Sequence, residues 1–205
     1  SKVLIDDDVS LFIDNNQRAL FIDGDKKNIK ITNKEDFEIL KLLKSGKTYF
    51  GIGFDVHRLV PKRKLYLGGV SIKSSLGTLG HSDGDPVLHA VIDGILGACR
   101  MGDIGEIFSD KSKKYKNIRS TILIKKIISK IKLKNFVINN IDVNIITQTP
   151  KIKKYKKKIA SSISKLCKIQ PKQINIKGKT TEKLGVIGIE KAIASEVIVS
   201  VKKYD

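Results

Sequence analysis

The chain has 205 residues, a formal net charge of +19 at pH 7 and 40% hydrophobic residues. That apolar content excludes a disordered chain and suffices for one ordinary domain with room for an appendage. No apolar run approaches the roughly 20 residues that span a bilayer, so we expect no membrane partner and no secretory signal. The two cysteines, Cys99 and Cys167, fall within helical patterns. They favour a reducing compartment over a disulfide framework.

The positive charge raises the question of nucleic-acid binding, which the sequence does not support. Lysines are spread through every segment from Lys26 to Lys203. The chain has neither the Cys/His spacing of zinc fingers nor the aromatic platforms of RNA-binding folds. We therefore expect no nucleic-acid partner. The one dense cluster, at residues 151–158, is either a solvated helix face or an anion-attracting rim near a phosphate site.

Residues 1–45 differ from the rest of the chain in sequence pattern, with short predicted elements, and hold too little apolar surface to form a domain alone. Periodicity predicts a short helix, two strands and an amphipathic helix, in that order, at residues 9–13, 20–22, 29–31 and 34–44. Gly46 is placed to end the last helix. The sequence therefore predicts a boundary near residue 45, with the main domain at residues 46–205.

Strands and helices alternate through residues 46–205 without an internal repeat, which indicates a layered α/β domain. Alternating apolar residues predict strands at residues 47–57, 65–67, 136–147, 174–176 and 193–201. Apolar residues at helical spacing predict helices at residues 86–99, 118–131 and 159–166.

The end of the first expected strand, Phe54-Asp55-Val56-His57, carries two metal-type ligands. Residues two apart on a strand project to the same face, so Asp55 and His57 point together. Phe54 and Val56 point to the other side, which we expect to face the core.

A third ligand is available from His89. Asp85-Pro86 predicts a helix start, and His89 lies on the helix that follows, four residues before Asp93. Three protein ligands and one open position are the arrangement of a catalytic zinc site. The alternative is that both histidines are buried and hydrogen-bonded to backbone. Spacing alone leaves both interpretations open.

Three polar turns complete the candidate features. Residues 77–85 form a loop rich in Gly, Ser and Asp that ends at a helix N-terminus, where backbone N–H groups favour phosphate. The turns at residues 147–151 and 180–185 each follow a strand. Taken alone, each is also explained as an ordinary capped turn.

Together, these motifs closely resemble the 2-C-methyl-D-erythritol 2,4-cyclodiphosphate synthase family, in register from about residue 48 to 203. The matching segments are Gly53-Phe54-Asp55-Val56-His57, Leu67-Gly68-Gly69-Val70, His81-Ser82-Asp83-Gly84-Asp85, Leu88-His89-Ala90, Gly102-Asp103-Ile104-Gly105, Asp142-Val143-Asn144-Ile145-Ile146 and Thr180-Thr181-Glu182-Lys183-Leu184-Gly185. The resemblance implies a homotrimer in the bacterial cytoplasm. Each subunit would have a four-stranded sheet with helices on one face, and the active sites would lie between subunits. The implied reaction converts 4-diphosphocytidyl-2-C-methyl-D-erythritol 2-phosphate to the cyclic diphosphate and CMP.

The resemblance also implies roles for individual residues. Zinc would be held by Asp55, His57 and His89, and a second cation, magnesium or manganese, by Glu182. The residues implied to bind substrate are His81 and Ser82 for phosphate, Asp103, Ile104 and Gly105 for methylerythritol, and Thr147, Lys151, Thr180 and Thr181 for the cytidine diphosphate. At Ile189 the chain lacks the arginine with which the family can hold an isoprenoid diphosphate on the trimer axis.

Residues 1–45 resemble the C-terminal end of 2-C-methyl-D-erythritol 4-phosphate cytidylyltransferase, which some bacteria fuse ahead of the cyclase. The resemblance rests on Asp7-Asp8-Val9-Ser10, Asn28-Ile29-Lys30-Ile31-Thr32 and Glu35-Asp36-Phe37. It implies an upstream cytidylyltransferase domain, whose nucleotide loop is absent from this sequence. The rival hypothesis for the main domain is a zinc-dependent phosphoesterase that uses a bound water.

Overall fold

The computed structural model describes residues 23, 31–36, 46–109, 115 and 117–204. The chain divides into two compact units, Ser1–Lys44 and Ser45–Asp205. In the first unit, residues 34–36 are helical, as expected for the start of the helix at residues 34–44. The Asp36 amide donates to Asn33 Oδ1 at 2.8 Å, and the Thr32 amide donates to Asp36 Oδ2 at 2.9 Å. The elements expected at residues 9–13 and 20–22, and most of 29–31, lie outside the described residues.

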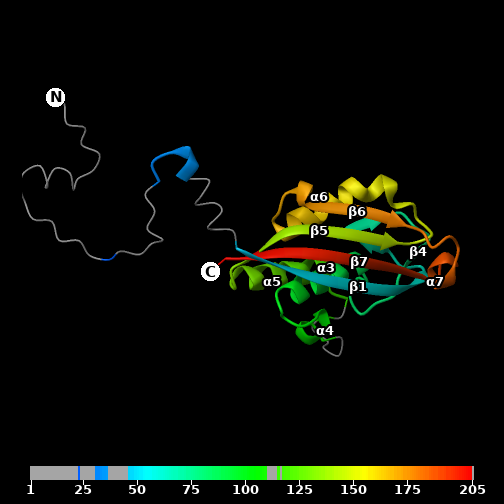
Figure 1. The fold of residues 1–205 in the computed structure, drawn as a ribbon. Coiled ribbons are helices and arrows are strands. Elements are labelled where there is room, and N and C mark those ends of the chain that lie inside the picture. The colour runs from blue at the N-terminus through cyan, green and yellow to red at the C-terminus, as the bar shows by residue number, and fades with distance from the viewer. Residues whose placement is uncertain (1–22, 24–30, 37–45, 110–114, 116, 205) are drawn as a thin grey trace, which may run out of the picture. The chain divides into compact units, whose positions relative to one another are not determined.

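The second unit is built on a five-stranded sheet with strand order β4-β1-β7-β5-β6 (Figure 1). The two long central strands, β1 (Lys47–Pro61) and β7 (Ala192–Lys203), are antiparallel. Next to β7 lies β5 (Phe136–Ile146), again antiparallel, and β6 (Ile174–Lys179) is parallel to β5. A separate hairpin joins β2 (Leu65–Leu67) and β3 (Val70–Ile72).

The expected four-stranded sheet is wrong by one strand. Strand β1 is longer than its pairing with β7, which covers Lys47 to Arg58. The remaining residues, Leu59 to Pro61, pair antiparallel with the short strand β4 (Leu76–Thr78). Its sequence, Leu76-Gly77-Thr78, has a single large apolar residue, so this edge strand shows no apolar alternation of the kind seen at residues 65–67.

Three long helices lie on one face of the sheet: α3 (Pro86–Ala98), α5 (Ser120–Lys132) and α6 (Lys156–Cys167) (Figure 1). The shorter elements are α4 (Ile104–Ile107), α7 (Gly185–Gly188) and two 3₁₀ turns, η2 (Ile152–Tyr155) and η3 (Pro171–Gln173). Within the part of the chain that the structure describes, no helix has the length and apolar content that a membrane crossing requires. Cys99 and Cys167 are both buried free thiols.

The core lies between the helices and the sheet, and its placement corrects one expectation about β1. Gly51 and Gly53 are buried on the helix side, the same side to which Asp55 and His57 point. Phe54 and Val56 do lie on the opposite face, but that face is open: their exposed fractions are 57% and 50%. The predicted alternation of side chains along β1 is confirmed, but the prediction that Phe54 and Val56 face the core is wrong. The helices cover the opposite face, which carries Gly51 and Gly53.

Candidate functional site

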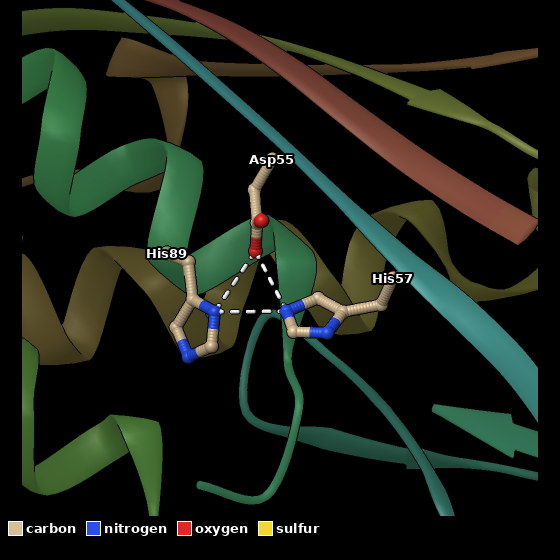
Figure 2. A group of neighbouring side chains, drawn as sticks. All are labelled: Asp55, His57 and His89. Carbon is tan, nitrogen blue, oxygen red and sulfur yellow. Dashed lines mark hydrogen bonds and ion pairs between the residues drawn. The ribbon is translucent and has the colours of Figure 1, made fainter. Parts of the chain in front are cut away.

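The site begins where β1 and α3 meet. Asp55 and His57 project from β1, and His89 lies in the first turn of α3 (Figure 2). The buried Asp85 carboxylate caps α3 by accepting the amides of Val87 and Leu88 at 3.1 and 3.0 Å. An N-cap acid followed by proline fixes where the helix starts. It thereby fixes which face of α3 presents His89 to β1.

Three ligand atoms form a small triangle at this junction (Figure 2). Asp55 Oδ2 lies 2.9 Å from His57 Nε2 and 2.9 Å from His89 Nδ1, and the two nitrogens are 3.2 Å apart. Ligands around a tetrahedral zinc at 2.0–2.1 Å stand about 3.3 Å from one another. The donor set and its spacing therefore fit a zinc ion with one position left open.

The charges in the triangle favour a carboxylate facing two imidazoles. Burial acts to raise the pKa of Asp55, but hydrogen bonds and charge interactions with His57 and His89 outweigh it and hold that pKa well below its usual range. For His57, burial acts to lower the pKa, and the contacts with Asp55 dominate and raise it above 6.5. The site thus attracts a proton to His57, and a metal ion bound there would replace that proton.

The outer nitrogens of both imidazoles have partners too. His57 Nδ1 lies 2.9 Å from the Leu79 carbonyl oxygen, an acceptor, so Nδ1 carries the proton and Nε2 keeps its lone pair for a metal. His89 Nε2 lies 2.9 Å from Ser120 Oγ and 3.0 Å from Ser82 Oγ. Both rings therefore turn one nitrogen into the triangle and bond the other to the protein.

A cavity of about 320 Å³ opens beside the two histidines. Four other residues expected at the site line this cavity: His81, Ser82, Ile104 and Gly105. The rest of the wall is formed by Phe108, Tyr115, Ile118 and Leu123. Asp103 does not line the cavity; its carboxylate caps α4 by accepting the Glu106 amide at 2.9 Å. Asp93, which the sequence placed on the face of His89, accepts the Ile104 amide at 2.8 Å and so ties α4 to α3.

The residues expected to hold cytidine diphosphate gather elsewhere. Thr147, Lys151 and Thr180 line a second cavity of about 280 Å³, together with Lys153, Lys156 and Lys179. Lys151, Lys153 and Lys156 come from the cluster at residues 151–158, and Lys179 is the last residue of β6. Thr181 and Glu182 lie on the turn that follows β6; the Glu182 carboxylate accepts the Thr180 hydroxyl at 2.6 Å, and Thr181 donates to the Leu184 carbonyl. Among the described residues, Glu182 does not belong to the group around Asp55.

Sequence reasoning missed the residues that support the triangle. Ser120 is completely buried at the start of α5, and its hydroxyl contacts both His89 and Asp83. Gly51 and Gly53 let β1 approach α3 at backbone distance. The alternating glycines of β1 were a signal for close backbone approach. Ser120 gave no signal, since its partners are more than 30 residues away.

The comparisons with known proteins agree with this architecture. Residues 48–202 match the YgbB family. The chain is 64% identical over 201 residues to a bifunctional enzyme IspD/IspF of Pelagibacter ubique, covering 98% of this chain and 53% of that protein. It is 48% identical over 149 residues to a 2-C-methyl-D-erythritol 2,4-cyclodiphosphate synthase of Caldicellulosiruptor bescii, covering 73% of this chain and 95% of that protein. The chain therefore spans about half the length of the bifunctional relative.

Solved structures show the same likeness. The bifunctional IspDF from Campylobacter jejuni superposes with a TM-score of 0.75 at 36% identity, over all of this chain and 56% of that one. A CDP complex of IspF from Plasmodium falciparum gives a TM-score of 0.69 at 37% identity, over 78% of this chain and 99% of that one. The family resemblance predicted from the motifs is thereby confirmed, and the chain belongs to the YgbB family.

Proposed function

We propose that residues 46–205 form a 2-C-methyl-D-erythritol 2,4-cyclodiphosphate synthase. The substrate is 4-diphosphocytidyl-2-C-methyl-D-erythritol 2-phosphate, and the products are the cyclic diphosphate and CMP. The observation that carries the proposal is the triangle of Asp55, His57 and His89 at the wall of the 320 Å³ cavity. Family membership and the named relatives support the same activity.

The reaction needs positioning and charge neutralisation more than proton transfer. The substrate's own 2-phosphate attacks the β-phosphorus of the diphosphate, the bond from that phosphorus to the bridging oxygen breaks, and CMP leaves with that oxygen. A phosphate monoester has a second pKa near 6, so the nucleophile is already anionic at neutral pH. The protein therefore requires no general base, and its part is to hold the two phosphates in line.

The candidate metal ligands would contribute to charge neutralisation in this reaction. A zinc ion bound by Asp55, His57 and His89 would supply Lewis-acid polarisation of a phosphate oxygen. The three side chains fix that position relative to the cavity wall. Ser82 and His81 are part of that wall, where they would contact phosphate oxygens. Ile104 and Gly105 contribute an apolar edge for the methylerythritol chain. Asp103 precedes them outside the cavity wall, and the family resemblance alone assigns it to the hydroxyl groups of the substrate.

The second cavity fits the cytidine diphosphate side. Its lysines, Lys151 among them, offer positive charge to phosphates, and Thr147 and Thr180 offer hydroxyl groups. Thr181 lies next to Thr180, on the turn that follows β6. Glu182 supplies an exposed carboxylate on the adjoining turn. Magnesium and manganese bind through one or two carboxylates plus substrate phosphates, which suits a second cation at Glu182.

The two cavities come together if the active site forms between subunits of a homotrimer. The open face of the sheet carries exposed apolar side chains on three strands: Phe50, Ile52, Phe54, Val56, Val137 and Ile198. A patch of this kind on one face is typical of a protein–protein interface. Burying it in a trimer accounts for a β1 face that is apolar and uncovered.

Residues 1–45 belong, in this proposal, to an upstream cytidylyltransferase domain. The bifunctional relative from Pelagibacter ubique aligns with 98% of this chain, which extends through those residues. The cytidylyl transfer itself would depend on the residues that the relatives have upstream.

The test is an end-point assay on the diphosphocytidyl substrate with magnesium and zinc, in which CMP and cyclic diphosphate are quantified separately. We expect equal amounts of both products from the wild type and loss of both in His89→Ala and Glu182→Gln. Ser129→Ala, an exposed α5 residue outside both cavities, serves as the control and should turn over normally. CMP without cyclic product would contradict the proposal and favour a water-dependent phosphoesterase.

A further inference from the structure

Ser120 stands at a junction that the metal ligands alone do not explain. It is the first residue of α5 and is completely buried. Its Oγ lies 2.9 Å from His89 Nε2 and 2.5 Å from Asp83 Oδ1. Three segments, the loop before α3, α3 itself and α5, therefore meet at one hydroxyl.

The Asp83 carboxylate determines which way the Ser120 hydroxyl donates its proton. Its Oδ2 takes the Arg119 Nε–H at 2.8 Å, and its Oδ1 takes the Ser120 backbone N–H at 3.1 Å. A carboxylate only accepts, so the Ser120 hydroxyl proton must point to Asp83. The lone pairs of Ser120 Oγ then face His89.

The orientation of Ser120 has a consequence for the imidazole of His89. An acceptor at 2.9 Å from Nε2 favours the tautomer with its proton on Nε2, which leaves Nδ1 unprotonated. His89 Nδ1 is the atom that faces Asp55 Oδ2 and His57 Nε2. For His57, the Leu79 carbonyl has the same effect, but as backbone it cannot be removed by a side-chain substitution.

We propose that Asp83 and Ser120 are positioning residues that hold His89 in its metal-binding tautomer, with Asp83 acting through Ser120. The inference rests on the proposed zinc site and adds to it a pair that touches neither metal nor substrate. The pair also determines where α5 begins: the Asp83 carboxylate receives the first amide of α5, and the Asp83 amide donates to the Ile118 carbonyl at 3.0 Å. The tautomer of His89 is thus tied to the packing of α5.

Ser82 is a second hydroxyl within hydrogen-bond distance of His89 Nε2, so its role must be separated from that of Ser120. Its Oγ lies 3.0 Å from the same nitrogen, but it also accepts the Gly84 amide at 3.2 Å. Ser82 Oγ is 3.5 Å from Ser120 Oγ, and among the residues that the structure describes no carboxylate accepts its proton. The direction of the Ser82 hydroxyl is therefore not fixed by a carboxylate, whereas Asp83 fixes that of Ser120 as an acceptor toward His89.

The experiment measures zinc affinity directly, by competition with a chromophoric chelator on the metal-stripped full chain. Ser120→Thr and Ser120→Val are the matched pair, since they add the same bulk and differ in whether the hydroxyl is present. We expect Ser120→Val and Ser120→Ala to bind zinc about 10–100-fold more weakly than the wild type, and Ser120→Thr to stay close to it. Asp83→Asn should also weaken binding, because the amide no longer orients the hydroxyl in the same way.

Two controls separate the positioning role from a structural one. Ser164→Ala removes another buried serine hydroxyl, one bonded to the Ser161 carbonyl on α6, and should leave zinc affinity unchanged. Thermal unfolding of each metal-free variant, with and without added zinc, then gives the stabilisation due to zinc alone. A purely structural role would lower the metal-free melting temperature equally in Ser120→Thr and Ser120→Val and leave zinc affinity intact.

The outcomes are distinct. Equal zinc affinity in Ser120→Thr and Ser120→Val would overturn the proposal, as would a loss confined to Ser82→Ala. A wild type that binds no zinc, or binds it as weakly as His89→Ala, would overturn the proposed metal site itself. A hydroxyl-dependent loss of affinity in the Ser120 variants would support the positioning role.

Discussion

Gly53 of β1 lies directly against the Ala90 carbonyl of α3. A Cβ atom at Gly53 would overlap that carbonyl oxygen and stand 2.7 Å from the Gly94 amide nitrogen. The strand and helix that carry the candidate metal ligands are therefore in backbone contact. His89 precedes Ala90 and Asp55 is two residues beyond Gly53, so this contact sets the gap across which the ligands face each other.

Gly53→Ala should therefore destabilise the protein and distort the metal site together. Because the new methyl group meets backbone atoms rather than a flexible side chain, we expect a loss of about 3 kcal/mol in the free energy of unfolding. Gly97→Ala is the matched control on the same helix, where the new Cβ finds only ordinary contacts at 3.8 Å or more. It should stabilise by about 0.5–1 kcal/mol through helix propensity. Urea unfolding of both variants checks this, and equal losses would contradict it.

Asp85 provides a second stability test. Its carboxylate accepts four backbone amides, those of Gly68, Gly69, Val87 and Leu88. Burial raises its pKa, although the amides of Gly69, Leu88 and Gly68 act to lower it. Asp85→Ala would leave the amides without their acceptor inside the protein, so we expect a loss of about 3 kcal/mol.

Asp103→Ala is the comparison for Asp85→Ala, since that exposed residue caps one amide of the short helix α4. We expect it to cost about 1 kcal/mol or less. The measurement is the denaturant midpoint of each variant. Equal midpoints would show that accepting four buried amides gives Asp85 no special role in stability.

Zinc affinity should rise with pH, because ligating imidazoles must be neutral. His57 has a pKa raised above 6.5 by Asp55, so protons compete for it above the range of an ordinary imidazole. Asp55 itself, with its pKa held low, is ionised throughout and does not compete. We expect affinity to improve by up to about tenfold per pH unit between about pH 6 and pH 8.

The metal-free protein should show the opposite trend. A raised pKa of His57 contributes stability that is fully present below 6.5 and is lost as pH rises through the folded-state value. Thermal unfolding with and without zinc across this range checks both signs. Zinc affinity independent of pH would argue against His57 as a ligand.

The trimer proposal is tested on the open face of the sheet. Ile52 is 71% exposed at the centre of the apolar patch, so Ile52→Glu should leave the subunit folded but place charge in the interface. We expect monomers by light scattering and at least about a tenfold loss of turnover, since unpaired charges are costly to bury. Leu133→Glu, at a residue 86% exposed at the end of α5, is the control and should remain trimeric. A trimeric Ile52→Glu would contradict this interface.

Much of this arrangement was predictable from local patterns. The i, i+2 spacing of Asp55 and His57 and the capped helix of His89 indicated the three candidate ligands that the fold brings together, while leaving a purely hydrogen-bonded role open. The family resemblance added Ser82, Ile104 and Gly105, which share the adjoining cavity. The spacing arguments needed only the periodicity of one strand and one helix, whereas the cavity residues were found through the family motifs; their roles remain predictions.

The remainder depends on contacts between distant segments. Ser120 reaches His89 across 31 residues and Asp83 across 37, and nothing in the local sequence marks such pairs. Strand β4 is visible only through its pairing with the end of β1. Phe54 and Val56 were assigned to the core because they are apolar, whereas a face can be apolar to meet another subunit.

The central claim, an intramolecular cyclisation, is tested most directly by running the reaction in ¹⁸O-labelled water with the wild-type enzyme. Attack by the substrate's own phosphate incorporates no solvent oxygen, so mass spectrometry should find unlabelled CMP and unlabelled cyclic diphosphate in equal amounts. An ¹⁸O atom in CMP or in a linear methylerythritol phosphate product would show that water is the nucleophile. That result would contradict the cyclase and identify a zinc-dependent hydrolase in its place.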